Sequence, residues 1–355
     1  MTLTHAVPRL GPFFPGAGLH SAPPQCPDAN LVSRVRRGHA ILGTALSIRR
    51  RRLIVLLGRP RQDYHLGMTD DVGGPSRESM VRVGRLNFHV VEWGDPHNFP
   101  VLLLHGRSGN AISWQRFAAR LAERYRVIAF DQRGHGLTDW PGRYTHRLLT
   151  GDVVGVAEAV GLGKLALIGH SMGAAIAWEY AARHSEDLSC LVIIDASPDP
   201  GEDEPLGASP QTPSGLRSPD EIVAWAATQG WTKGIDRPDL DRWLTRYARP
   251  APDGGYVRGF DESAYDEAYV SGRMWPSNRT DWRAISRIAC PTLVVVGEDG
   301  IVGRELGELL ARRLRHGEFA FIPGTGHLVH WQSLPAALAA VRPFLDAHEP
   351  AAADP

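Results

Sequence analysis

A sharp turn between a strand-length run and a helix-length run constrains this chain more than any other feature. Leu165–Ile168 is apolar and has the length of a buried strand, and Ala174–His184 has a helical pattern. Between them lies Gly169-His170-Ser171-Met172-Gly173, which fits G-x-S-x-G. The two glycines leave room for a strand to reverse into a helix, and the serine between them is expected in a strained backbone conformation that presents its hydroxyl. The pattern therefore predicts a strand, a tight turn and a helix, with a nucleophilic serine at the turn.

Strands and helices are predicted to alternate along most of the chain. Further buried-strand runs are Val101–Leu104, Arg126–Phe130, Leu191–Ile194 and Thr292–Val296, and Met80–Val83 with Leu86–Val91 suggests an opening hairpin. Helices are expected at Trp114–Glu123, Val153–Val160, Ala174–His184, Glu305–Leu314 and Ala336–Leu345. This alternation is typical of an α/β fold, in which helices cover both faces of a mostly parallel sheet.

Three more motifs accompany the serine turn. The strand run Val101–Leu104 leads into His105-Gly106-Arg107-Ser108-Gly109-Asn110, and the next run leads into Asp131-Gln132-Arg133-Gly134-His135-Gly136. A late segment, Phe319–Gly326, ends at His327. With these four motifs in this order, residues 78–348 resemble the α/β-hydrolase superfamily. The resemblance implies a twisted, mostly parallel sheet flanked by helices, with a helical cap inserted over the active site.

The alternating pattern breaks between Ser197 and Arg287, where a linker rich in Pro, Gly and Ser precedes amphipathic stretches. Five of the ten tryptophans lie there, so this interval has the aromatic side chains to surround an apolar substrate. We therefore expect a hydrolase core over residues 78–196 and 286–348, and the helical cap over 197–285.

Residues 1–67 have no sustained period and carry ten arginines against Asp28 and Asp63, a net charge of +8. We expect this segment to be unstructured or extraneous to the working protein; a basic arm that contacts membrane or nucleic acid is the alternative. Its apolar run, Leu53–Leu57, is far shorter than the roughly 20 residues that span a bilayer, so no stable membrane insertion is expected.

Charge and cysteine content narrow the setting of the protein. The formal net charge of the whole chain is zero, so the part after residue 67 is acidic and has no basic stripe, which argues against a nucleic-acid partner. Three cysteines are too few for a disulfide framework and fit a reducing compartment, so a cytoplasmic location is expected. The oligomeric state stays open.

A serine hydroxyl needs a neighbouring base, which is usually a histidine oriented by a carboxylate. His327 is the predicted base because it follows the late strand and precedes the last helix, the position that the family's histidine holds; His330 is the fallback. The resemblance also implies an oxyanion hole formed by the backbone amides of Arg107 and Met172.

The triad acid is where the sequence departs from the family pattern. In relatives the carboxylate occupies the fourth place of Gly-x-x-Asp, but here Gly297-Glu298-Asp299-Gly300 has glycine there. Asp299, one place early, is the first choice. Asp195, at the end of the preceding strand, and Glu298 remain as alternatives.

These residues predict a cofactor-independent serine hydrolase that cleaves a carboxylic ester, thioester or lactone through an acyl-serine intermediate. Its partner would be a small substrate that is apolar in part. No metal cluster or nucleotide-binding motif is recognisable, so no metal or cofactor is expected. Serine at the turn argues against the epoxide-hydrolase branch, which carries aspartate there. The alternatives are hydrolysis of a carbon–carbon bond, an amide or a peptide on the same triad, and a capped-pocket ligand receptor with little turnover.

Overall fold

The structure is a computed structural model that describes residues 77–198, 212–213, 215–251, 254–262, 265 and 278–350. The segment 1–67, and the expectation attached to it, lie outside the described residues. Among the described residues, no helix is long and apolar enough to cross a membrane.

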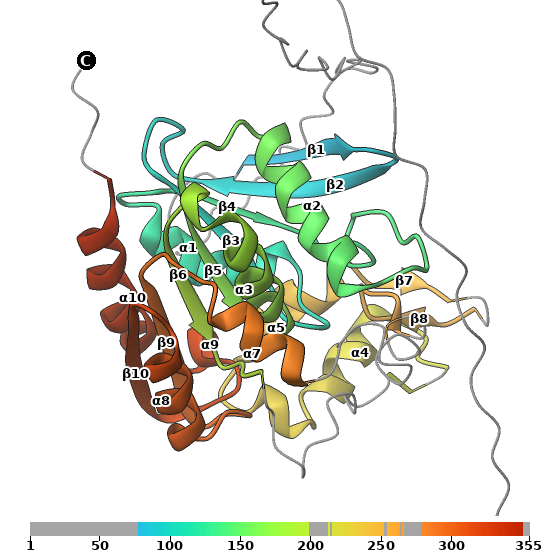
Figure 1. The fold of residues 1–355 in the computed structure, drawn as a ribbon. Coiled ribbons are helices and arrows are strands. Elements are labelled where there is room, and N and C mark those ends of the chain that lie inside the picture. Colours follow the sequence, from blue (N-terminus) through green and yellow to red (C-terminus); the bar gives the residue numbers. More distant parts are fainter. Residues whose placement is uncertain are drawn as a thin grey trace, which may run out of the picture. The chain divides into compact units, whose positions relative to one another are not determined.

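Eight strands form the main sheet in the order β1-β2-β4-β3-β5-β6-β9-β10 (Figure 1). The strands are β1 (Arg77–Val83), β2 (Leu86–Trp93), β3 (Pro100–Leu104), β4 (Arg126–Phe130), β5 (Leu165–His170), β6 (Leu188–Ile194), β9 (Thr292–Asp299) and β10 (Gly317–Gly326). The pairs β1–β2 and β2–β4 are antiparallel, and the other neighbours pair in parallel. The predicted hairpin and the mostly parallel sheet are therefore confirmed. Because parallel strands end at one edge, the loops after β3, β5, β6, β9 and β10 come together there.

Helices cover both faces of the sheet. One face packs against α2 (His146–Ala159), α3 (Met172–His184), α7 (Asn278–Ile285) and α8 (Arg304–Arg313). The other face packs against η1 (Ala111–Trp114), α1 (Gln115–Leu121), α9 (Val329–Gln332) and α10 (Leu334–His348). The short 3-10 helix η2 (Ser185–Asp187) follows α3 in the chain. The five predicted helices are present with shifted ends, and the largest shift is in α2, which begins seven residues before Val153.

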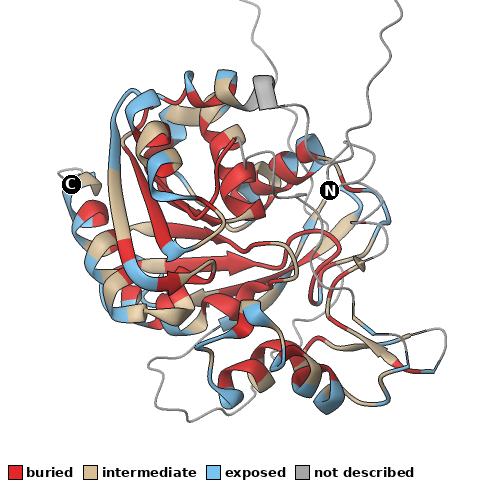
Figure 2. Ribbon diagram, turned by 90° about the horizontal axis from the view of Figure 1, so that it is seen from below, coloured by how far each residue is buried: buried red, intermediate tan, exposed pale blue. Residues whose placement is uncertain are grey.

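Side chains alternate between the two faces of each central strand, as the period of a strand requires. In β3, Leu102 and Leu104 pack with α3, whereas Val101 and Leu103 pack toward α1 and α10. All four are fully buried, which explains why this strand is apolar at every position. Figure 2 shows that the central strands are buried and that exposed residues lie on the outer faces of the helices.

Between β6 and α7, the described residues 212–262 form an insertion segment with a small core of its own. It consists of α4 (Pro219–Ala226), η3 (Gly230–Thr232), α5 (Arg237–Thr245) and a two-stranded antiparallel sheet of β7 (Arg249–Pro250) and β8 (Tyr256–Val257). Ile222, Val223, Leu240 and Trp243 are buried together in this segment. The sequence predicted its helices and missed the strand pair, because two-residue strands leave no periodic signal.

Candidate active site

Ser171 stands between β5 and α3 in a conformation that L-residues rarely adopt. It follows His170, the last residue of β5, and its φ of 52° and ψ of −120° lie outside the usual regions. The strained turn expected at this serine is therefore confirmed. Helix α3 begins at Met172, and no side-chain hydrogen bond caps this end, so the positive end of the helix dipole lies beside Ser171.

Both glycines of the turn are required by close approach. A Cβ at Gly169 would lie 2.4 Å from the Gly173 carbonyl oxygen, and a Cβ at Gly173 would lie 2.3 Å from the Leu104 carbonyl oxygen. These obstacles are backbone atoms, which cannot rotate away as a side chain can. The steric role predicted for the two glycines is therefore confirmed.

Gly173→Val is accordingly expected to reduce the yield of soluble protein and to lower the melting temperature sharply, because the new side chain collides with the end of β3. Gly151→Val is the matched control, since Gly151 lies in α2 and a Cβ there has no neighbour within 4 Å. Expression yield and thermal melting of both variants test this. A soluble Gly173→Val protein that melts like the Gly151→Val control would contradict the prediction.

The loop after β3 passes directly beside Ser171. A Cβ at Gly106 would lie 3.1 Å from the Cβ of Ser171 and 2.8 Å from Nδ1 of His170. A turn follows, in which the Gly109 amide donates to the Gly106 carbonyl at 3.0 Å and Ser108 has a φ of 63°. Arg107 lies within this turn, so its backbone is held near the serine.

His105 fixes the start of that loop as a neutral side chain. Its Nδ1–H donates to the Gly106 carbonyl at 2.8 Å, and its Nε2 accepts from the Gln132 amide at 3.0 Å. Burial lowers the pKa of His105 to about 4. His105 therefore braces the start of the loop.

Asp131 holds the other end of the loop. Its Oδ1 accepts from the Ala111 amide at 2.7 Å, and its Oδ2 lies 2.8 Å from Nδ1 of buried His89. The His89 ring also lies 3.1 Å from Glu78, which binds Arg246 of the insertion segment at 2.6 Å. Asp131 therefore acts as a structural partner of this loop.

Because His89 is held in its charged form, we expect the folded protein to lose stability at alkaline pH. Burial alone would lower its pKa, but Asp131 and Glu78 outweigh burial and raise the pKa of His89 to about 9. Because this folded-state pKa exceeds the ordinary value of 6.5, the stabilisation is complete below about pH 6.5 and is lost as the pH rises through 9. We expect the urea unfolding free energy of the wild type to fall by up to about 3 kcal/mol more than that of His89→Gln between pH 6 and pH 10. Equal pH slopes for the two proteins would contradict this.

His327 follows the edge strand β10, whose pairing with β9 is irregular between Ile322 and Gly326. Its Nδ1 lies 2.6 Å from Oδ2 of Asp195, and 26% of its side chain is exposed. An Nδ1–H that donates to this carboxylate leaves the lone pair of Nε2 free to accept a proton. Asp195, and not Asp299, is thus the carboxylate beside His327.

Asp195 follows β6 directly and is fully buried. Its φ of 45° turns the chain at the end of the strand, and its Oδ2 also accepts from the Ile301 amide at 2.9 Å. The backbone turn at Asp195 and the Ile301 amide therefore fix the carboxylate in the position where it contacts His327.

The other two candidate acids are placed differently, which corrects the choice of Asp299. Asp299 ends β9 exposed, and its backbone is paired with Gly326. Glu298 is also exposed, and its carboxylate accepts from the Gly324 amide at 2.8 Å. Glu298 and Asp299 thus lie along the β9–β10 pair, while the end of the neighbouring strand β6 supplies the carboxylate at His327.

Gly300 explains the departure from the Gly-x-x-Asp pattern. The three atoms nearest to a Cβ at Gly300 all belong to the Asp195 carboxylate, with Oδ1 at 2.3 Å and Oδ2 at 2.7 Å. The φ of Gly300 lies outside the positive range that favours glycine. The carboxylate of Asp195 therefore occupies the space that a side chain at position 300 would need.

His170 joins the serine turn to the His327 loop. Its Nε2–H donates to the His327 carbonyl at 2.9 Å, and the two rings lie 4.6 Å apart. His330, the fallback base, is buried and stacks on Trp114 at 4.1 Å, and burial lowers the pKa of His330 to about 3. The structure thus places His327 beside Asp195 and the Arg107 turn beside Ser171, with His170 linking the serine turn to the His327 loop, and it gives His330 a packing position.

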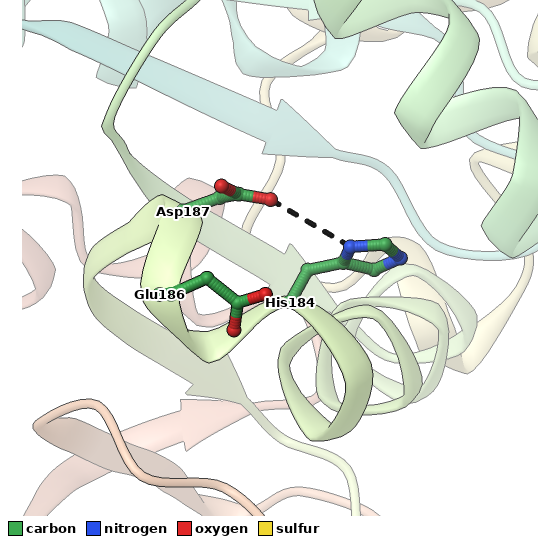
Figure 3. Close-up of side chains that lie close together, drawn as sticks. All are labelled: His184, Glu186 and Asp187. Atoms are coloured by element: carbon green, nitrogen blue, oxygen red, sulfur yellow. Dashed lines mark ion pairs between the residues drawn. The ribbon is translucent and has the colours of Figure 1, made fainter. Parts of the chain in front are cut away.

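One group of described residues has the spacing of metal ligands: His184, Glu186 and Asp187 (Figure 3). His184 ends α3 and its Nδ1 lies 3.6 Å from Asp187, on the surface. Because α3 has 13 residues, this group lies about 20 Å from Ser171. It is therefore separate from the candidate active site.

Comparisons with known proteins support the fold. Residues 101–341 match the family described as the alpha/beta hydrolase family. The 2-(acetamidomethylene)succinate hydrolase of Mesorhizobium japonicum is 29% identical over 272 residues, which cover 75% of this chain and 94% of that protein. Epoxide hydrolase 3 of Xenopus tropicalis is 31% identical over 140 residues, 39% of this chain and only 38% of that relative. A crystal structure of E-2-(acetamidomethylene)succinate hydrolase has a TM-score of 0.67 and 25% identity, over 77% of this chain and 100% of the other.

Proposed function

Because the chain belongs to the α/β-hydrolase family, we propose that it is a serine hydrolase that cleaves a carboxylic ester, thioester or lactone without a cofactor. The observation that carries this proposal is the hydrogen bond between His327 and Asp195, beside a serine held at positive φ. Such a bond fixes the tautomer that a general base needs.

The proposed reaction needs only groups of this chain, the substrate and water. Nε2 of His327 takes the proton of Ser171 while Oγ attacks the carbonyl carbon, and the amides of Arg107 and Met172 stabilise the oxyanion. When the intermediate collapses, His327 gives its proton to the leaving alcohol or thiol and an acyl-serine remains. Water, deprotonated by His327, then releases the acid and restores the serine.

We assign the orienting role to Asp195 in place of Asp299. Asp195 is buried and touches His327, and Gly300 leaves the space for its carboxylate. We further propose that the insertion segment 212–262 is the cap over the site and that its aromatic side chains favour a small substrate with an apolar part. Trp225 and Trp231, which are only partly buried, support this role.

Amide hydrolysis on the same triad is the second candidate. It is favoured by the Mesorhizobium relative, whose name specifies a substrate with an acetamido group and of which this chain covers 94%. Serine at position 171 keeps the epoxide-hydrolase reaction out of the proposal, because that branch carries aspartate at the turn.

A fluorophosphonate probe, followed by a panel of substrates, tests the proposal. We expect labelling of Ser171 and turnover of p-nitrophenyl acetate and butyrate, a thioester or a lactone. Turnover of acetamido compounds with no turnover of esters would select the second candidate. Absence of both labelling and turnover would contradict a hydrolase and favour the ligand receptor.

A further inference from the structure

The residues that follow His327 belong to the core and the cap at once. Leu328 is 8% exposed and packs in the cap's own core with Leu240 and Trp243. The short helix α9, which begins one residue later, contacts α1 and α10 on the sheet side and lies near α5 (Figure 1). The backbone that follows His327, the proposed base, therefore continues directly into the contact between the core and the cap.

Trp331 strengthens this junction. Its Nε1–H donates to the carbonyl oxygen of Ser113 in η1, the 3-10 helix that follows the loop after β3. Its ring lies 5.3 Å from that of Trp243 in the cap. Helix α9 is thus held between η1 and the cap.

Gln332 uses both ends of its side-chain amide at this junction. Its Oε1 accepts from the amide of Gly326, the residue before His327, at 2.8 Å. Its Nε2–H donates to the carbonyl of Lys233 in the cap at 2.7 Å. One side chain therefore connects the backbone beside His327 to the backbone of the cap.

The backbone at Gly326 needs such support. Regular pairing of β10 with β9 stops at Ile322 and resumes only at Gly326, opposite Asp299. Between them the chain bulges, so fewer ladder bonds hold the approach to His327. The hydrogen bond from the Gly326 amide to Gln332 gives this part of the chain an additional support.

We infer that Gln332 is a positioning residue through which the cap fixes His327, an inference that rests on the proposed function. The cap then has a second role besides covering substrate: it sets the orientation of the base. A small displacement of a catalytic group lowers the rate of the chemical step with little effect on substrate binding.

Two substitutions separate the two bonds. Gln332→Glu keeps an oxygen for the Gly326 amide but places a carboxylate oxygen against the Lys233 carbonyl, where no donor remains. Gln332→Leu removes both bonds. The control is Arg116→Met, which removes the 2.7 Å ion pair between α1 and Asp239 of the cap and leaves the His327 segment untouched.

The readouts are kcat and KM for p-nitrophenyl acetate, the rate of fluorophosphonate labelling, and thermal melting. Values of kcat are taken from the plateau of the pH profile, so that a new charge at position 332 does not distort them. We expect Gln332→Glu and Gln332→Leu each to lower kcat and the labelling rate by about tenfold or more with KM within about twofold, and Arg116→Met to leave kcat unchanged.

Wild-type kcat in Gln332→Glu would overturn the inference, as would an equal loss of kcat in Arg116→Met. If Gln332→Leu fails to fold, the isosteric Gln332→Glu carries the test. A wild-type protein without labelling or turnover would instead refute the proposed function, so the two failures are distinguishable.

Discussion

Ser171→Ala is expected to lower turnover by a factor of about 10³ or more while the protein stays folded. The substitution removes the attacking oxygen and keeps the Cβ, so the positive φ of 52° costs the same in both proteins. Turnover of p-nitrophenyl butyrate and thermal melting, measured on wild type and variant, test this.

His327→Ala is the companion variant. Because the serine and its base act as one unit, the double variant is expected to be little slower than either single variant. If Ser171→Ala kept more than about a tenth of the wild-type activity, the serine would not be the nucleophile.

Asp195→Asn is expected to lower kcat by about 10² to 10⁴, because the amide favours the wrong tautomer of His327. Asp299→Asn is the matched control and should stay close to the wild type, since Asp299 is exposed and only its backbone is paired there. Steady-state kinetics of both variants at one pH are sufficient. The opposite ranking would return the acid to the loop after β9.

A double substitution that moves the aspartate from position 195 to position 300 tests the same site. A Cβ at Gly300 would lie 2.7 Å from Asp195 Oδ2, which lies 2.6 Å from Nδ1 of His327. Since a carboxylate oxygen lies about 2.4 Å beyond its Cβ, an aspartate at position 300 reaches hydrogen-bonding distance of that nitrogen. Asp195→Gly with Gly300→Asp is therefore expected to regain at least about tenfold in kcat over Asp195→Gly alone. Glycine also suits the φ of 45° at position 195.

Local patterns predicted the sheet and the serine turn because their causes are local. Leu165–Ile168 is apolar at every position since both faces of β5 are covered, and Gly169 and Gly173 are glycines since backbone atoms approach them. His327 was predicted as the base from the resemblance, because it holds the position of the family's histidine after the late strand. These signals lie within a few residues of the feature that they predict.

The acid could not be chosen from the sequence, because the choice depends on two strands that are far apart in the chain. β6 and β9 are neighbours in the sheet, and both end at the same edge with carboxylates. Only the turn at Asp195 and its bond to the Ile301 amide decide which carboxylate meets His327. Gln332 was missed for a similar reason, since nothing in its sequence neighbourhood specifies two backbone partners, Gly326 and Lys233.

The close approach of Gly300 and Asp195 also bears on how such a site can change in evolution. A lineage that gained an aspartate at position 300 first would place its Cβ 2.3 Å from Oδ1 of Asp195, so two carboxylates would compete for one space. A lineage that lost Asp195 first would leave His327 without its partner. Either single step is costly, so the two acid positions are separated by a barrier that only paired substitutions cross. In this chain, the glycine at position 300 therefore fits the proposed acid at the end of β6.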